Sequence, residues 1–333
     1  MGDSDSLEPV LVNTATGAVP VEDLGITLMH EHIFVLSTEV HQNNLQLWDE
    51  QAQIDNAVRM LRAAAERGVK TIVDLTVIGQ GRFIPRIKEV AKRLPELNIV
   101  VATGVYTYNE EPMYFAFRGP GRVFEGPDPM AELFIRDITQ GIGDTGVRAS
   151  VLKCATETEH LPEGVERVLR STAQAHRETG VPIQTHSNAL ARNGTLQQKV
   201  FAEEGVDLSR VVIGHSGDTD DIDYLRQLLD AGSYLGMDRF GMEFIAPPEQ
   251  RVETVAALVH AGYTDQLVLS HDCPCFLDYL TTDQRDMVAP DWNFTYLHDQ
   301  VLPALRKADV SDEQIHTMLV ENPRRVFSRN APY

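Results

Sequence analysis

Five side chains that can bind a metal ion stand at the ends of predicted β-strands. Only one residue separates His30 from His32, so in a strand both imidazoles lie on the same face. His186, His215 and Asp272 each follow a different apolar run. Imidazole nitrogens and carboxylate oxygens are ligands of zinc and related divalent cations. A lone histidine after a strand is more often structural, but five such residues in phase predict one shared metal site.

Lys153 ends a further predicted strand and adds a second kind of chemistry. Five protein ligands are too many for one catalytic zinc ion that keeps a position open for water. Two ions about 3.5–4 Å apart would need bridging groups. An ammonium group cannot bind a cation, but a buried lysine with a lowered pKa can react with carbon dioxide to give an anionic, bridging carbamate. Pairing of Lys153 with an acidic residue explains its position equally well.

Eight short apolar runs, alternating with longer helical patterns, must position these residues. The predicted strands are 26–29, 71–75, 99–103, 149–153, 182–185, 211–214, 233–237 and 267–270. The predicted helices are 51–67, 163–179, 219–231 and 249–261, each followed by a glycine, with closing helices at 297–308 and 312–321. This order predicts an α/β fold, a (β/α)8 TIM barrel with the metal centre at the C-terminal face of its strands. An open doubly wound sheet is the alternative, but the sequence lacks its glycine-rich dinucleotide fingerprint.

The length of 333 residues fits either one barrel or two ordinary domains. No linker or low-complexity stretch divides the sequence, so we predict a single domain over residues 1–333. Two long insertions, 109–129 and 273–296, follow the third and eighth predicted strands. In a barrel both would lie on the C-terminal face, where active sites are built.

Charge and composition exclude several classes of partner. The net charge of −20 argues against nucleic acid and membrane surfaces as partners. The sequence MGDSDSLEPV at the N-terminus is acidic, unlike a signal peptide, and no apolar run reaches the roughly 20 residues of a membrane-spanning helix. Three cysteines are too few for a disulfide scaffold. These features predict a cytoplasmic protein.

The sequence around these residues resembles the amidohydrolase superfamily and, more closely, its phosphotriesterase-like lactonases. The resemblance extends over about residues 9–329. The motifs that carry it are LMHEHIF at 28–34, VDLTVIG at 73–79, ATGVYTYN at 102–109, VLKCATE at 151–157, GHSGD at 214–218, LGMDRFG at 235–241, LSHD at 269–272 and ENPRRVF at 321–327. Together these motifs make the match specific.

The resemblance implies two divalent metal ions as cofactors. Six residues would bind them: His30, His32, Lys153, His186, His215 and Asp272. The first pair of histidines and Asp272 would hold the more buried ion, and His186 and His215 the more exposed one. Carboxylated Lys153 and a hydroxide would bridge the two. Zinc is the ion we expect, while cobalt, manganese and iron also suit histidine and carboxylate ligands.

The resemblance also assigns catalytic residues and separates related branches. Asp272 would accept the proton of the hydroxide, and Tyr106 matches the tyrosine that lines the lactone subsite. Arg239 stands where the lactonase-like branch has arginine and true phosphotriesterases have another residue. Phe34 replaces the arginine with which dihydroorotases bind a carboxylate. Pro274 departs from the family pattern, in which cysteine is common two residues after the metal-binding aspartate.

The implied function is metal-dependent opening of the lactone ring of N-acyl homoserine lactones by the bridging hydroxide, which would quench quorum signals. Weak organophosphate triesterase activity is the implied side reaction, and a homodimer the implied assembly. The alternatives are a primary phosphotriesterase, a hydrolase of other γ- or δ-lactones, and a non-catalytic metal-binding scaffold. A channel for the acyl chain is expected in the insertion at 273–296, and most of its large apolar side chains are expected simply to pack the insertion on the barrel. These side chains are Phe276, Leu277, Tyr279, Leu280 and Trp292.

Overall fold

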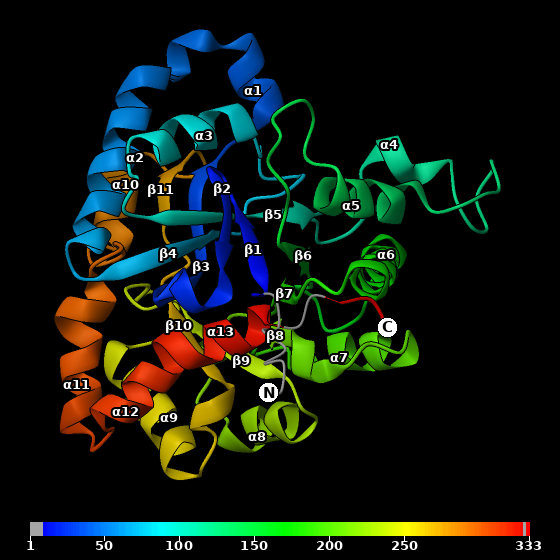
Figure 1. The fold of residues 1–333 in the computed structure, drawn as a ribbon. Coiled ribbons are helices and arrows are strands. Elements are labelled where there is room, and N and C mark those ends of the chain that lie inside the picture. Colours follow the sequence, from blue (N-terminus) through cyan, green and yellow to red (C-terminus); the bar gives the residue numbers. More distant parts are fainter. Residues whose placement is uncertain (1–8, 329–330) are drawn as a thin grey trace, which may run out of the picture.

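Eight parallel strands close into a barrel in the computed structural model, which describes residues 9–328 and 331–333. In order around the barrel, the strands are β3 (Ile26–Val35), β4 (Val69–Asp74), β5 (Asn98–Gly104), β6 (Val151–Ala155), β7 (Ile183–His186), β8 (Val211–Ile213), β9 (Tyr234–Asp238) and β10 (Leu267–Ser270). The two ends of this series meet where the backbone N–H of Asp272 donates to the carbonyl of His30, at 2.9 Å. Helices surround the strands (Figure 1), so the predicted (β/α)8 fold is confirmed.

Each of the eight predicted strands corresponds to one barrel strand, but the first is much longer than predicted. The apolar run at 26–29 is only the first half of β3, which continues to Val35. Its second half pairs in parallel with an additional strand, β11 (Pro274–Leu277), with His32 opposite Pro274. His30 and His32 therefore lie in the middle of β3, whereas we expected them at its end.

The barrel interior below the predicted metal site is filled with apolar side chains. Met29, Val73, Val100, Val212 and Val268 come from five strands and are all at most 1% exposed. A hairpin of β1 (Leu11–Thr14) and β2 (Gly17–Pro20) and the C-terminal helix α13 (Asn322–Phe327) belong to the same apolar cluster. The two segments cover the N-terminal end of the barrel (Figure 1), so access is left at the opposite end.

The helices outside the barrel pack on the strands through apolar faces. The four predicted helices are confirmed as α2 (Glu50–Ala65), α6 (Glu163–Thr179), α8 (Ile222–Asp230) and α9 (Pro248–His260). In α2, for example, the Asp49 side chain caps the first turn and Ile54, Val58 and Leu61 are buried. The helices α3 (Ile84–Lys92), α5 (Pro129–Thr139) and α7 (Gly194–Glu203) were not predicted.

The two insertions carry short elements at the C-terminal end of the barrel. The helix α1 (Thr38–Asn43) follows β3, and α4 (Met113–Ala116) lies in the insertion at 109–129. The insertion at 273–296 contains β11 and α10 (Thr282–Val288). The closing helical region comprises α11 (Leu302–Lys307), α12 (Asp312–His316) and α13. One π-helical turn precedes α11, and another joins α12 to α13. Among the described residues, no helix is long and apolar enough to cross a membrane.

Candidate metal centre

All eight residues predicted for the site line one pocket of about 200 Å³ at the C-terminal end of the barrel. They come from seven different strands or from the loops that follow them: His30, His32, Tyr106, Lys153, His186, His215, Arg239 and Asp272. The polar ends of parallel strands converge at one end of a barrel, which explains how residues 242 positions apart in the sequence reach each other.

A first group of ligand atoms surrounds Asp272. Its Oδ1 lies 3.2 Å from Nε2 of His32 and 3.5 Å from Nε2 of His30, and these three ligand atoms lie within 4.8 Å of one another. Nζ of Lys153 lies 2.8 Å from Nε2 of His30. The backbone leaves no room for a side chain beside this lysine, because a Cβ on Gly104 would lie 1.8 Å from the Lys153 carbonyl oxygen.

A second group lies on the other side of the Asp272 carboxylate. Nε2 of His215 lies 2.9 Å from Nδ1 of His186 and 3.7 Å from Oδ2 of Asp272. The two groups thus share Asp272, and they divide the histidines as the family resemblance implies.

Asp238, which our sequence predictions missed, orients a histidine in each group. Its Oδ2 lies 2.7 Å from Nδ1 of His30, and its Oδ1 lies 2.8 Å from Nδ1 of His215. A neutral histidine that donates through Nδ1 keeps the lone pair of Nε2 free. One buried carboxylate at the end of β9 therefore aims two ligand atoms at the pocket.

The remaining two histidines, His32 and His186, are each oriented by a hydrogen-bond partner of their own. Nδ1 of His32 lies 2.9 Å from Oγ1 of Thr76, which donates to Asp74. Nε2 of His186 lies 2.8 Å from Oε2 of Glu157, so its Nδ1 faces the pocket. Glu157 was not predicted as a site residue.

Burial favours the neutral form of His30, His186 and His215, whereas the Asp272 carboxylate stays charged. Desolvation lowers the pKa values of His30 and His215 well below the usual range and that of His186 to about 4. Burial opposes ionisation of Asp272, but His30, His32 and Arg239 outweigh it and hold the pKa of this carboxyl below its usual range. Burial lowers the pKa of Lys153 to about 8.

These contacts bring the lone pairs of neighbouring ligand atoms close together, an arrangement that suits bound cations. With both Nδ1 atoms donating elsewhere, Nε2 of His30 and Nε2 of His32 turn lone pairs toward an Asp272 oxygen. Nδ1 of His186 and Nε2 of His215 likewise face each other as acceptors at 2.9 Å. Acceptors this close need a positive charge between them, which divalent cations supply.

Arg239 and Tyr106 line the pocket beside these ligands. Nε of Arg239 lies 3.1 Å from Oδ2 of Asp272, and its Nη1 lies 2.7 Å from Oδ2 of Asp218. Asp218 in turn pairs with the buried Arg251, at 2.8 Å. The hydroxyl of Tyr106 contacts that of Tyr108, and burial raises the pKa of Tyr106 well above its usual range. The phenol of Tyr106 therefore stays protonated.

Backbone strain is concentrated at this site. Among the described residues, four non-glycine residues have positive φ, and two of them are His215 at 60° and Asp272 at 53°. Such conformations cost free energy and are retained where surrounding contacts hold them, commonly at functional sites. Asp272 is held by the hydrogen bond of its backbone N–H to His30.

Glu31, between the two histidines of β3, serves the barrel wall rather than the pocket. Its Oε1 accepts from Oγ of Ser270 at 2.8 Å, from the backbone of His271 at 3.0 Å and lies 2.7 Å from Nδ1 of His271. Its Oε2 accepts from the backbone N–H of Cys273 at 2.8 Å. Glu31 thus joins β3 to the chain around Asp272.

The apolar side chains of the insertion at 273–296 divide between two cavities. Leu277, Tyr279 and Trp292 line the pocket of the candidate metal centre. Phe276 and Leu280 instead line a second cavity of about 900 Å³, on the other side of β11. Three of the five apolar side chains therefore lie on the pocket of the candidate metal centre and two line only the larger cavity, since alternate residues of an extended strand face opposite sides.

Comparisons with known proteins agree with this geometry. The family model described as "Phosphotriesterase family" matches residues 10–327. The chain is 54% identical to a "Phosphotriesterase homology protein" of Mycobacterium tuberculosis, over 97% of this chain and 99% of that protein. It is 40% identical to an "Aryldialkylphosphatase" of Saccharolobus solfataricus, over 93% and 97%. A solved structure titled "Structure of the phosphotriesterase from Mycobacterium tuberculosis" matches with a TM-score of 0.95 and 54% identity, over 97% of this chain and all of that one.

Proposed function

Because the chain belongs to the phosphotriesterase family, we propose that it is a hydrolase that opens the lactone ring of N-acyl homoserine lactones. Enzymes of this family use a binuclear metal centre. The group of His30, His32 and Asp272, with His186 and His215 on the other side of the carboxylate, suits one. Slow hydrolysis of organophosphate triesters would accompany the main activity.

The proposed cofactors are two divalent cations, with zinc as the expected ion. His30, His32 and Asp272 would hold one, and His186 and His215 the other. The pKa of Lys153 near 8 leaves roughly a tenth of its amines neutral at pH 7, far more than for an exposed lysine. A neutral amine is what reacts with carbon dioxide, which supports a carboxylated Lys153 as the bridge between the ions.

The residues of the chain would then bind the lactone, transfer the proton of the attacking water molecule and stabilise the negative charge that develops on oxygen. When bound, the cations lower the pKa of a water molecule and polarise the ester carbonyl. The Asp272 carboxylate accepts the proton and passes it to the leaving alkoxide. Arg239 remains positively charged beside Asp272, and the protonated Tyr106 hydroxyl donates to the oxygen on which negative charge develops.

The small volume of the pocket carries the proposal for a lactone. About 200 Å³ is less than the roughly 300–1,000 Å³ of sites that enclose drug-sized ligands. A lactone ring is compact, and the rest of the substrate extends from it in one direction. A phosphate triester, in contrast, extends three substituents around its phosphorus. Tyr106, Arg239 and Trp292 are among the side chains that line this pocket.

A primary phosphotriesterase is the second candidate. It is favoured by the printed names of the relatives in Mycobacterium tuberculosis and Saccharolobus solfataricus. The position of Arg239 argues against a primary phosphotriesterase. This side chain is fixed by two carboxylates and cannot easily move aside for a bulky ester group.

A proton-release assay with metal-reconstituted protein tests whether the site hydrolyses lactones. Ring opening of a homoserine lactone near neutral pH yields a carboxylate and a proton, which a pH indicator detects. We expect Asp272→Asn to lose at least about 10³-fold in kcat, because the proton acceptor is removed. The exposed Asp223→Asn on α8 is the matched control and should retain wild-type activity. Equal activity in both variants would refute the role of Asp272.

A further inference from the structure

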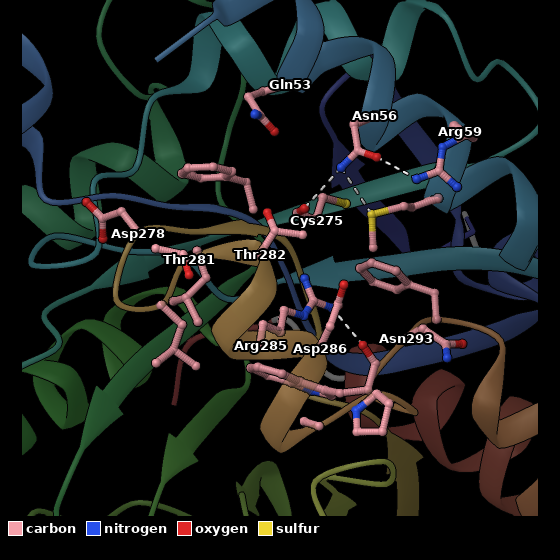
Figure 2. Close-up of a pocket in the computed structure, with 18 of the residues that line it drawn as sticks. Gln53, Asn56, Arg59, Cys275, Asp278, Thr281, Thr282, Arg285, Asp286 and Asn293 are labelled. Atoms are coloured by element: carbon pink, nitrogen blue, oxygen red, sulfur yellow. Dashed lines mark hydrogen bonds between the residues drawn. The ribbon is translucent and has the colours of Figure 1, made fainter. Parts of the chain in front are cut away.

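The insertion at 273–296 forms a thin wall between two cavities. The pocket of the candidate metal centre, about 200 Å³, lies on one side, and the cavity of about 900 Å³ lies on the other. Leu277 and Trp292 line both. The larger cavity runs between α2 and α10, with Cys275 of β11 between them (Figure 2). The wall therefore has open space behind it, while β11 within it is held from the side by its pairing with β3.

Arg285 of α10 ties the beginning and the end of this wall together. Its Nη1 donates to the carbonyl of Pro274 at 2.9 Å, and its Nη2 donates to the carbonyl of Trp292 at 2.6 Å. Its guanidinium carbon also lies 5.0 Å from the centroid of the Trp292 ring. One side chain thus holds two backbone segments that are 18 positions apart, and it faces the larger cavity (Figure 2).

The remaining contacts of Trp292 connect it to the metal centre. Its indole Nε1 donates to the carbonyl of His271 at 2.9 Å, one residue before Asp272. From the far side of the larger cavity, Nδ2 of Asn56 reaches the carbonyl of Cys275 at 3.4 Å, which is a long contact. Arg285 therefore holds both ends of the wall through hydrogen bonds from its charged guanidinium to backbone carbonyls.

We propose that Arg285 is a positioning residue that sets the width of the substrate pocket. By clamping Pro274 to Trp292, it keeps the wall against the metal centre and excludes bulky substrates. The identity of the substrate rests on the proposed lactonase function, but the clamp does not. Both backbone carbonyls are reached at once by the planar, forked guanidinium, which lysine cannot reproduce with a single ammonium group.

Acrylamide quenching of Trp292 fluorescence tests the clamp without any enzymatic activity. The chain has two tryptophans, so Trp48→Phe leaves Trp292 as the sole reporter. Trp292 is 7% exposed, and slow quenching is expected in this background. Adding Arg285→Met should raise the quenching constant at least about twofold, and Arg285→Lys should do the same because it lacks the fork. Arg59→Met, which removes a cation from the opposite side of the same cavity, should leave quenching unchanged.

Kinetics with short and long lactones test the effect on the pocket. In Arg285→Met and Arg285→Lys, the KM of decanoyl homoserine lactone should fall about fivefold relative to that of the butanoyl compound, with kcat changed less than twofold. A merely structural role would lower kcat and metal content for both substrates alike. Arg59→Met should keep the wild-type ratio.

The outcomes separate the two proposals. Increased quenching without lactone hydrolysis would support the clamp and contradict the lactonase. Unchanged quenching in both Arg285 variants would overturn the clamp, whatever the kinetics show. If Arg285→Met fails to fold, the comparison of Arg285→Lys with Arg59→Met decides, because lysine preserves the charge and most of the volume.

Discussion

Oδ1 of Asp238 lies 2.8 Å from Nδ1 of His215, and the same oxygen accepts the backbone N–H of this histidine at 2.7 Å. The other oxygen of Asp238 holds Nδ1 of His30. One side chain thus fixes the tautomer of a ligand in each half of the candidate metal centre. The two halves are therefore expected to lose metal together when this carboxylate is changed.

Asp238→Asn should weaken the affinity for zinc about 10- to 100-fold, as removal of outer-shell partners commonly does. The amide would place an N–H group against one of the two donating nitrogens and force that histidine into the other tautomer. The measurement is a competition titration of metal-free protein with a chelating dye. Asp223→Asn is the control, and equal affinity in the two variants would contradict the role of Asp238.

Lys153→Arg should abolish binding of two ions per chain. Arginine keeps the positive charge and could still pair with an acid, but it does not form a carbamate. Metal analysis of the purified variant gives the stoichiometry, and ¹³C NMR of wild-type protein reconstituted with ¹³C-bicarbonate should show a carbamate signal that the variant lacks. Two ions per chain in the variant would favour the simple ion-pair alternative for Lys153.

Glu31→Gln should destabilise the protein by roughly 2–4 kcal/mol, because buried N–H groups would face an amide N–H in place of a carboxylate oxygen. Glu31 is fully buried and accepts from the backbone of both His271 and Cys273. Urea unfolding provides the free energy. Glu39→Gln on the exposed face of α1 should change it by less than about 0.5 kcal/mol.

His176 should make the folded state lose stability as the pH falls. Burial lowers its pKa to about 4, and as a neutral ring it donates to the Val181 carbonyl and accepts from the Tyr333 hydroxyl, both at 2.7 Å. Between pH 6.5 and 4 the unfolded state binds more protons at this residue than the folded state does. Stability from His176 is therefore complete above pH 6.5 and decreases toward pH 4.

The measurement is the free energy of unfolding at pH 7 and pH 5. Wild-type protein should lose about 2 kcal/mol more than His176→Gln across this interval. Other buried histidines titrate in both proteins, so their contribution cancels in the difference. An identical loss in the two proteins would mean that His176 is not held neutral.

The strands were predictable because their apolar runs are buried on both faces, which few other structures produce. Several helices were missed, among them α5 and α7. Asp128 caps α5 and Pro129 occupies its first turn, a common start for a helix, but these residues read as the end of the insertion at 109–129. In α7, the buried Gln197 and Gln198 interrupt the apolar pattern that predicts an amphipathic helix.

The ligands of the candidate metal centre were predictable from residue type and position, whereas the residues that orient them were not. A single aspartate after a strand carries no local sign of its partner, and Asp238 contacts His30 across 208 positions of sequence. Glu157 is the last residue of the VLKCATE motif at 151–157, but its role depends on the position of His186 in the next strand. The second cavity arises from the pairing of β11 with β3, which no periodicity in the sequence indicated.

The most direct test of the central claim is the ratio of kcat/KM for hexanoyl homoserine lactone to that for an aryl dialkyl phosphate triester, measured on the same zinc-reconstituted protein. A pocket of about 200 Å³ lined by Arg239 and Trp292 predicts that the lactone is preferred by at least about 10²-fold. A ratio below one, with two ions bound per chain, would contradict the lactonase and identify the triester as the better substrate.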